Sequence, residues 1–185
     1  MRILIVVASQ TGRTWKLGEA VAAGARAVGA EVLLERAEAA TPAQALAADA
    51  LILGSGVHMA GMESAMSAFF ERLAPLWLTG ALIGKIGAVF ASAGNGGRGG
   101  GELTLISLLA NLAEHGLLLV PMHNRLPQYL EAGCHWGPLA WTNPRAGAAG
   151  PTPAHLEAAR AHGEHVAQMA ARWRRGARDW HCASV

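Results

Sequence analysis

The chain alternates short apolar runs with longer segments whose apolar residues recur at helical spacing, and this alternation limits the folds it can adopt. The first run, residues 2–8 (RILIVVA), is almost wholly apolar and β-branched, which is typical of a strand buried on both faces of a parallel sheet. Later apolar runs predict further strands over residues 31–35, 49–54, 85–92 and 117–121. Helical patterns predict helices over residues 14–28, 42–48, 63–73, 103–114 and 152–174.

Five strands that alternate with helices favour a parallel sheet with right-handed crossovers and helices on both faces. The expected fold class is therefore α/β, a flavodoxin-like three-layer sandwich with a five-stranded parallel sheet in the order 2-1-3-4-5. No linker or internal repeat divides the chain, so residues 1–176 are expected to form one domain and residues 177–185 a flexible tail. Residues 124–150 are expected to be an irregular segment, in which Trp136 and Trp141 either close the site or pack at a subunit interface, and the interface is favoured.

Composition excludes several classes of protein. Hydrophobic residues make up 52% of the chain and charged residues 15%, which favours a compact globule over a disordered chain. A net charge of +2 is too small to indicate nucleic acid or a membrane surface as partner, and no apolar stretch approaches the ~20 residues of a membrane span. Cys134 and Cys182 form no CxxC pair, so zinc ribbons and thioredoxin chemistry are not indicated. A cytoplasmic protein is expected.

Ligands of open α/β sheets bind outside the carboxyl ends of the strands, so the loop after the first strand is the first candidate site. Free amide groups and the positive end of a helix dipole favour an anion there, while a simple hydroxyl-capped helix start is the alternative. The loop lacks GxGxxG and GxxxxGK[ST], which disfavours an NAD-type or NTPase site. Its candidate phosphate-binding residues are Ser9, Gln10, Thr11, Gly12, Arg13 and Thr14.

Two further loops carry glycines that allow the backbone to approach a flat ligand closely. Residues 54–62 supply Val57, His58 and Met59, with a flexible loop and a surface histidine as the alternative. The loop at residues 92–102 is predicted to wrap a ligand, with a low-complexity segment as the alternative. Its candidate residues are Ser92, Ala93, Gly94, Asn95, Gly96 and Gly97.

Histidines offer no convincing metal site. His162 and His165 have the i, i+3 spacing of a ligand pair, but no third ligand is evident, so solvent-facing histidines are favoured and no metal is expected. His115 and His58 are the candidate proton donors. The alternative for His115 is a histidine that interacts with the dipole at a helix C-terminus.

The ordered set of motifs resembles the WrbA-type NAD(P)H:quinone oxidoreductases, an FMN-binding branch of the flavodoxin-like proteins. Residues 80–85 (GALIGK) and 89–92 (VFAS) are similar to the family's GALYGK and VFSSTGTGGG. The similarity continues through His115-Gly116 and Val120-Pro121 into the last helix, and covers nearly the whole chain.

The resemblance implies an FMN-dependent enzyme that transfers two electrons from NADH or NADPH to a quinone, assembled as a dimer or tetramer. It implies that residues 9–14 hold the FMN phosphate, that residues 57–59 and 92–97 contact the flavin, and that His115 contacts the flavin and is a candidate catalytic residue. Trp77 would lie near the quinone. A flavodoxin-type electron carrier and a non-enzymatic regulatory flavin-binding protein are the alternatives. Carriers commonly present an acidic surface, and this chain is slightly basic.

The chain departs from the family in the loop that faces the flavin. His58 and Met59 stand where the family has an arginine and a phenylalanine, so a permanent charge and an aromatic wall are lost. The chain is therefore predicted to be a divergent member whose substrate can differ.

Overall fold

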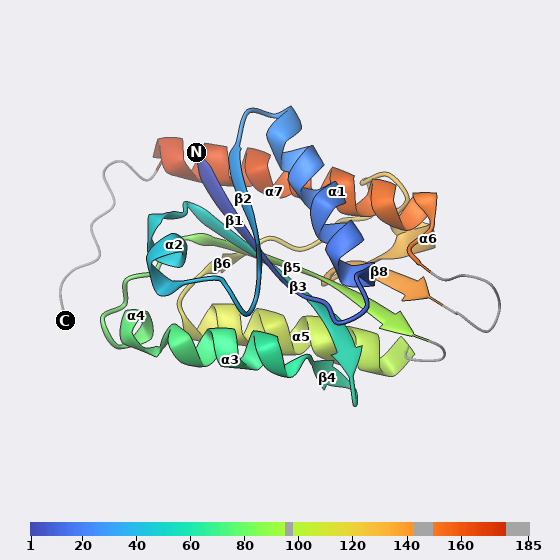
Figure 1. Ribbon diagram of the computed structural model, residues 1–185. Coiled ribbons are helices and arrows are strands. Elements are labelled where there is room, and N and C mark those ends of the chain that lie inside the picture. The colour runs from blue at the N-terminus through green and yellow to red at the C-terminus, as the bar shows by residue number, and fades with distance from the viewer. Residues whose placement is uncertain (95–97, 143–149, 177–185) are drawn as a thin grey trace.

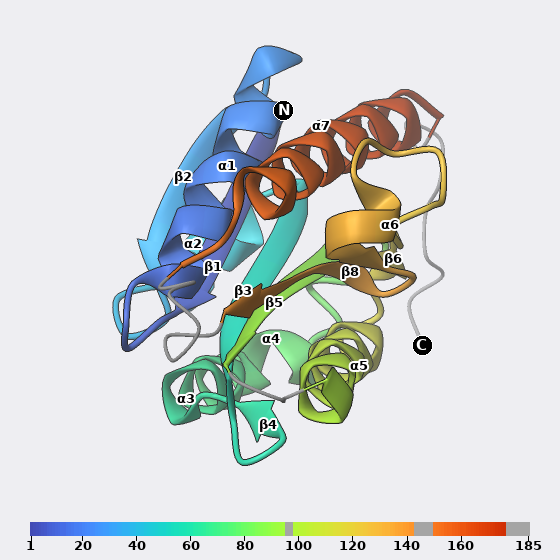
Figure 2. The ribbon, with the colours of Figure 1, turned by 90° about the vertical axis from the view of Figure 1, so that its right-hand side faces the viewer.

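A computed structural model describes residues 1–94, 98–142 and 150–176 of the chain. Three layers are visible, with a twisted central sheet between two layers of helices (Figure 1). In the view turned by 90°, α1 and α7 lie against one face of the sheet, and α3, α4 and α5 lie beyond the other (Figure 2). The helices are α1 (Arg13–Ala27), α2 (Pro42–Ala47), α3 (Ser64–Arg72), α4 (Ala74–Leu78), α5 (Arg98–Glu114), α6 (Tyr129–Ala132) and α7 (Pro153–Gly176).

The central sheet has the order β2-β1-β3-β5-β8-β7. Strands β2, β1, β3, β5 and β8 run parallel to one another, whereas β4 and β7 pair antiparallel with β3 and β8. The flavodoxin-like fold predicted from the alternation of strands and helices is confirmed. The strands are β1 (Arg2–Ala8), β2 (Glu31–Arg36), β3 (Ala50–His58), β4 (Gly61–Met62), β5 (Ile86–Gly94), β6 (Leu118–Leu119), β7 (Gly133–Cys134) and β8 (Gly137–Thr142).

The fifth position of the sheet is filled by two separate segments, so the prediction of one strand over residues 117–121 is wrong in extent. Only Leu118–Leu119 form β6, which pairs with the beginning of β5. Pro121 follows, and a proline has no N–H group to continue the ladder. The chain then leaves the sheet through α6 and β7 and returns as β8, which pairs with the end of β5. Residues 133–142, predicted to be irregular, therefore complete the sheet.

Strand burial on both faces produces two apolar cores. Residues 3–8 of β1 are all buried, with alternate side chains entering the cores on opposite faces. One core packs β1, β3 and β5 against α2, α3 and α5, and the other packs them against α1 and α7. Gly24 and Gly163 allow α1 and α7 to approach closely, because an added Cβ would lie 1.8 Å from the Arg160 carbonyl oxygen and 2.1 Å from that of Val21, respectively.

His162 and His165 were predicted to face solvent, and this prediction is wrong for His162. His155 is 6% exposed and joins two elements: its Nε2 accepts from the Trp141 N–H, and its Nδ1, which carries the proton in that tautomer, donates to the Thr152 Oγ1 at 2.9 Å. His162 is fully buried, and burial lowers its pKa to about 3. Within the described ranges, no group of three or more His, Cys, Asp or Glu side chains could hold a metal ion.

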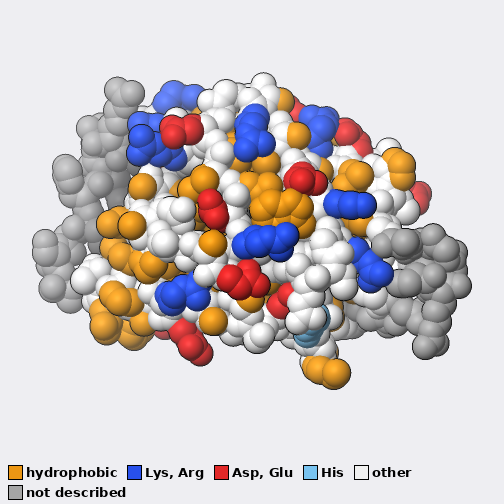
Figure 3. Space-filling model, in the orientation of Figure 1, with side chains coloured by type: hydrophobic (Ala, Val, Ile, Leu, Met, Phe, Trp, Pro, Cys, Tyr) orange, Lys and Arg blue, Asp and Glu red, His pale blue; other side chains and the backbone are white. Residues whose placement is uncertain are grey.

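Charge is mixed over the face seen in Figure 3, where Lys and Arg side chains lie among Asp and Glu side chains. This face therefore carries no broad patch of one sign. Among the described residues, no helix is long and apolar enough to cross a membrane.

Candidate flavin site

The loops after β1, β3 and β5 meet at one edge of the sheet because these three strands are neighbours. Ala8 is in register with Ser55, and Gly56 is in register with Ser92. The Thr14 Oγ1 in the first turn of α1 lies 2.8 Å from the Ser92 Oγ at the end of β5, and this contact is buried. The structure thus brings together residues from all three segments that the sequence had singled out.

The first loop presents backbone amides at the start of a long helix. Gly12 adopts a positive φ of 76° as the residue preceding the 15-residue helix α1, a conformation that favours glycine. No acidic residue lies in the first turn of this helix, so no side chain of that turn neutralises the positive end of the helix dipole. The Ser9 Oγ accepts a hydrogen bond from the Trp15 N–H at 3.3 Å, which fixes the loop to the helix. This arrangement suits an anion.

The second segment is more regular than predicted, since β3 continues to His58 instead of ending at residue 54. It turns through Met59 and Ala60, which both have positive φ, and returns as β4. The Met59 side chain is fully exposed at the tip. Gly100 of α5 packs against this turn, because an added Cβ would lie 3.2 Å from the Ala60 Cα. The turn is therefore backed by the beginning of α5.

The third segment is only partly described. Ser92 and Ala93 are buried at the end of β5, and Gly94 is exposed beyond them. The hydroxyl of Ser92 contacts Thr14, and the Thr142 Oγ1 of β8 donates to the Ala93 carbonyl at 3.2 Å. The remaining predicted contacts, Asn95, Gly96 and Gly97, lie outside the described residues.

Sequence reasoning missed Glu63, a glutamate that the structure places among these loops. Its side chain is 6% exposed, and its carboxylate oxygens accept the Gln10 N–H at 3.1 and 3.4 Å. The Glu63 Oε1 also lies 3.7 Å from the His58 Nε2. The sequence offered one signal, a glutamate at the first position of the helix predicted over residues 63–73, but nothing in that pattern indicates a contact with Gln10.

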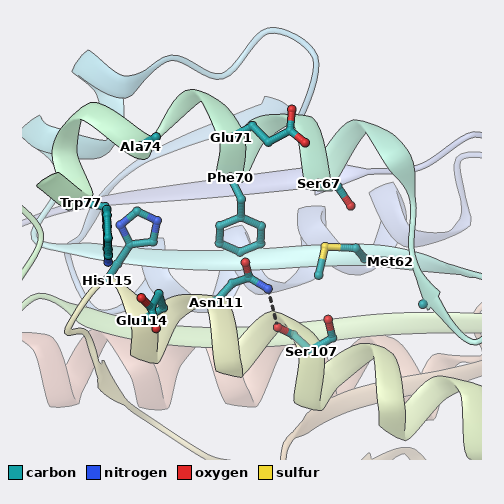
Figure 4. A pocket seen from close by; sticks show the side chains of 11 residues that line it. Met62, Ser67, Phe70, Glu71, Ala74, Trp77, Ser107, Asn111, Glu114 and His115 are labelled. Carbon is teal, nitrogen blue, oxygen red and sulfur yellow. Dashed lines mark hydrogen bonds between the residues drawn. The ribbon is translucent and has the colours of Figure 1, made fainter.

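His115 and Trp77 lie side by side in a groove between α3–α4 and α5 (Figure 4). The groove has a volume of about 620 Å³ and begins near Gly61 and Met62 of β4. The His115 ring stacks on Phe70 with a centroid distance of 6.4 Å, and its Nδ1 is buried without a hydrogen-bond partner in the described part of the chain. Burial lowers the pKa of His115, while the Glu114 charge opposes this shift.

The far end of this groove is remote from the three loops of the same chain. His115 follows the C-terminus of α5, whereas the N-terminus of α5 lies beside the turn at Ala60. A helix of 17 residues is about 25 Å long. His115 and Trp77 therefore line the same groove, and His115 lies far from the flavin loops of its own chain. Their roles toward flavin and quinone remain predictions.

Comparison with known proteins agrees with this architecture. The family model for NADPH-dependent FMN reductase matches residues 35–125. An NAD(P)H dehydrogenase (quinone) from Rhizobium rhizogenes is 31% identical over 92% of this chain and 98% of its own. Its namesake from Paraburkholderia phymatum is 34% identical with the same coverage. The chain belongs to the NAD(P)H dehydrogenase (quinone) family. The resemblance inferred from the ordered motifs is thereby confirmed.

Solved structures support the fold of this family member. A WrbA-like flavodoxin from Agrobacterium tumefaciens superposes with a TM-score of 0.70 at 24% identity, over 92% of this chain and 98% of the other. A flavodoxin from the domain Archaea gives a TM-score of 0.71 at 20% identity, over 92% and 99% of the two chains.

Proposed function

We propose that the protein is an FMN-dependent oxidoreductase that transfers two electrons from NADH or NADPH to a quinone. One observation carries the proposal: the amides that open α1, the turn at the end of β3 and the end of β5 converge at the carboxyl edge of the sheet. The relatives named NAD(P)H dehydrogenase (quinone) and the FMN reductase family model support the assignment of cofactor and donor.

The residues at this edge fit a flavin mononucleotide. The amides of Thr11, Gly12 and Arg13 would hold the phosphate, because they open a helix whose first turn carries no acidic residue. The backbone of residues 57–59 would lie against the ring, with Ser92 and Gly94 on the neighbouring strand. Bound there, FMN supplies hydride and electron transfer, which the side chains cannot perform.

The protein's contribution is to position the ligand and to limit its exposure to water. Pairing of β3 with β5 fixes the distance between the two ring-facing segments, because the strands stay in register as far as Gly56 and Ser92. The exposed Met59 at the tip is placed to cover one edge of the ring. His58, with its side chain 42% exposed, is the imidazole nearest this turn that can exchange a proton with a substrate oxygen.

A dimer or tetramer would give the groove at His115 and Trp77 a role. Trp77, Leu78 and Ile106 expose apolar surface along α4 and α5, and a second copy could bring its own flavin loops against this groove. The Trp77 side chain would then border the quinone, and the neutral imidazole of His115 would face the flavin. A cytoplasmic location, where NADH and NADPH are available, is part of the same proposal.

Two measurements test the proposal. Addition of FMN to the purified protein should quench the flavin fluorescence and shift its absorbance, with saturation at one FMN per chain. In anaerobic stopped flow, NADH or NADPH should then bleach the bound flavin, and a quinone should restore its colour. Binding without direct bleaching would favour the electron carrier instead, and no binding by folded protein would refute both.

A further inference from the structure

Glu63 introduces a negative charge into the loops that are proposed to hold a phosphate. It is the last residue before α3, and its backbone N–H donates to the Ser55 Oγ at 2.9 Å, so the residue is fixed to β3. The residue as a whole is 4% exposed. A carboxylate removed from water at this level requires partners, since burial of an unpaired charge is costly.

The partners of the carboxylate lie in the candidate site and not in the helix that Glu63 precedes. The side chain makes no capping hydrogen bond to α3. Instead it accepts the Gln10 N–H at 3.1 and 3.4 Å and lies 3.7 Å from the His58 Nε2. An N-capping function therefore does not explain its position.

The carboxylate also fills the space directly over β3. A Cβ added to Gly56 would lie 2.2 Å from the Glu63 Oε1 and 3.5 Å from the Thr14 Oγ1. Glu63 thus stands between the first turn of α1 and the end of β3, where it contacts groups from both loops. An amide donor that is bonded to a carboxylate is not free for a phosphate oxygen, and two anions that share one loop repel each other.

We propose that Glu63 is an internal anion that competes with the phosphate of FMN for the loop at residues 9–12 and so determines how strongly the site favours FMN over the uncharged riboflavin. The inference rests on the proposed function, because it concerns the same loop. Binding of FMN displaces the carboxylate from the Gln10 N–H or places two negative charges beside it. Riboflavin has no phosphate, so its binding neither displaces the Glu63 carboxylate nor places a second negative charge beside it.

The variant Glu63→Gln tests this competition. Glutamine keeps the length of the side chain and an oxygen that can accept the Gln10 N–H, but it removes the charge. Fluorescence titration should show FMN binding about tenfold tighter in Glu63→Gln than in the unmodified protein, with riboflavin binding changed by less than about twofold. The control Glu31→Gln removes the same charge from an exposed residue at the opposite edge of the sheet, where Glu31 pairs with Arg2. It should bind both flavins as the unmodified protein does.

The outcomes separate this inference from the proposed function. Unchanged or weaker FMN binding by folded Glu63→Gln would overturn the competition, and weaker binding would mean that Glu63 only positions the loop. Failure of every variant to bind FMN would overturn the proposed function as well. If Glu63→Gln does not fold, NMR of the unmodified protein decides the question. The Glu63 carboxyl carbon and the Gln10 amide should shift on addition of FMN and not of riboflavin, and equal responses to both ligands would overturn the inference.

Discussion

The hydroxyls of Thr14 and Ser92 lie 2.8 Å apart in the protein interior, although 78 positions separate them in the sequence. Thr14 is 1% exposed and Ser92 7%, so neither hydroxyl has water as a ready substitute partner. This contact joins the first turn of α1 to the end of β5. It therefore fixes the phosphate end of the proposed site relative to the ring end.

We expect Thr14→Val to lower the free energy of unfolding by about 1–3 kcal/mol, because it leaves the buried Ser92 hydroxyl without a partner among the described residues. The double variant Thr14→Val/Ser92→Ala should recover part of that loss, since both polar groups are then removed. Urea denaturation of the single and double variants measures this coupling. Strictly additive losses would contradict a direct bond between the two hydroxyls. Thr79→Val, at an exposed threonine after α4, provides the matched control.

The close approach of α1 and α7 gives a second prediction. Gly24→Ala should lower the free energy of unfolding by about 2 kcal/mol or more, because the new Cβ would meet the Arg160 carbonyl oxygen, a backbone atom that cannot rotate away. Gly176→Ala is the control, because a Cβ at the end of α7 has no neighbour within 4 Å. Thermal unfolding followed by circular dichroism compares the two variants. Equal melting temperatures would show that the helices can separate without cost.

The sequence predicted the framework of the fold well, because buried parallel strands are continuous apolar runs. The run at residues 2–8 is a clear example, and it forms β1 with the predicted bounds. The fifth strand was harder to predict. The strand β8 begins with Gly137 and Pro138, and β6, which pairs with the same edge of β5, has only two residues. Pairing of both with one edge of β5 is a tertiary relationship that no local pattern contains.

The candidate site was also predicted only in part. The three loops followed from the rule that ligands bind at the carboxyl ends of strands, so residues such as Thr14 and Ser92 could be named in advance. The contact of Glu63 with the Gln10 N–H depends on how α3 meets the sheet, and the local sequence does not encode that orientation. The distance of His115 from the loops likewise follows from the length of α5 and from the packing of its N-terminal end beside the turn at Ala60. The sequence does not reveal that packing.

The proposed assembly predicts different effects for two exposed tryptophans. Trp77 and Trp136 are 46% and 42% exposed, but only Trp77 borders the groove at His115. We expect Trp77→Ala to weaken self-association on the order of tenfold or more, as loss of a central aromatic anchor does in other interfaces, and Trp136→Ala to leave it unchanged. Light scattering coupled to size-exclusion chromatography over a range of concentrations measures the effect. A larger loss of self-association in Trp136→Ala than in Trp77→Ala would place the interface at β7–β8. A monomeric unmodified protein would refute the proposed assembly.

Burial of His162 predicts that stability falls in mild acid. The folded state holds this imidazole neutral, because burial and the nearby His165 and His123 lower its pKa to about 3, whereas the unfolded chain takes up a proton near pH 6.5. Between these values the unfolded state binds more protons than the folded state, so the free energy of unfolding decreases as the pH falls, by up to about 1.4 kcal/mol per pH unit.

The variant His162→Leu should remove most of this slope. Neither ring nitrogen of His162 has a hydrogen-bond partner among the described residues, so an apolar side chain of similar size also removes an unsatisfied group. Urea denaturation at pH 7 and pH 5 should show a smaller loss of stability for His162→Leu than for the unmodified protein. His135→Leu, at an exposed histidine, should keep the original slope. His115, His155 and His165 also have lowered pKa values, so a residual slope of the same sign is expected. An unchanged slope in His162→Leu would show that His162 reaches solvent in the folded protein.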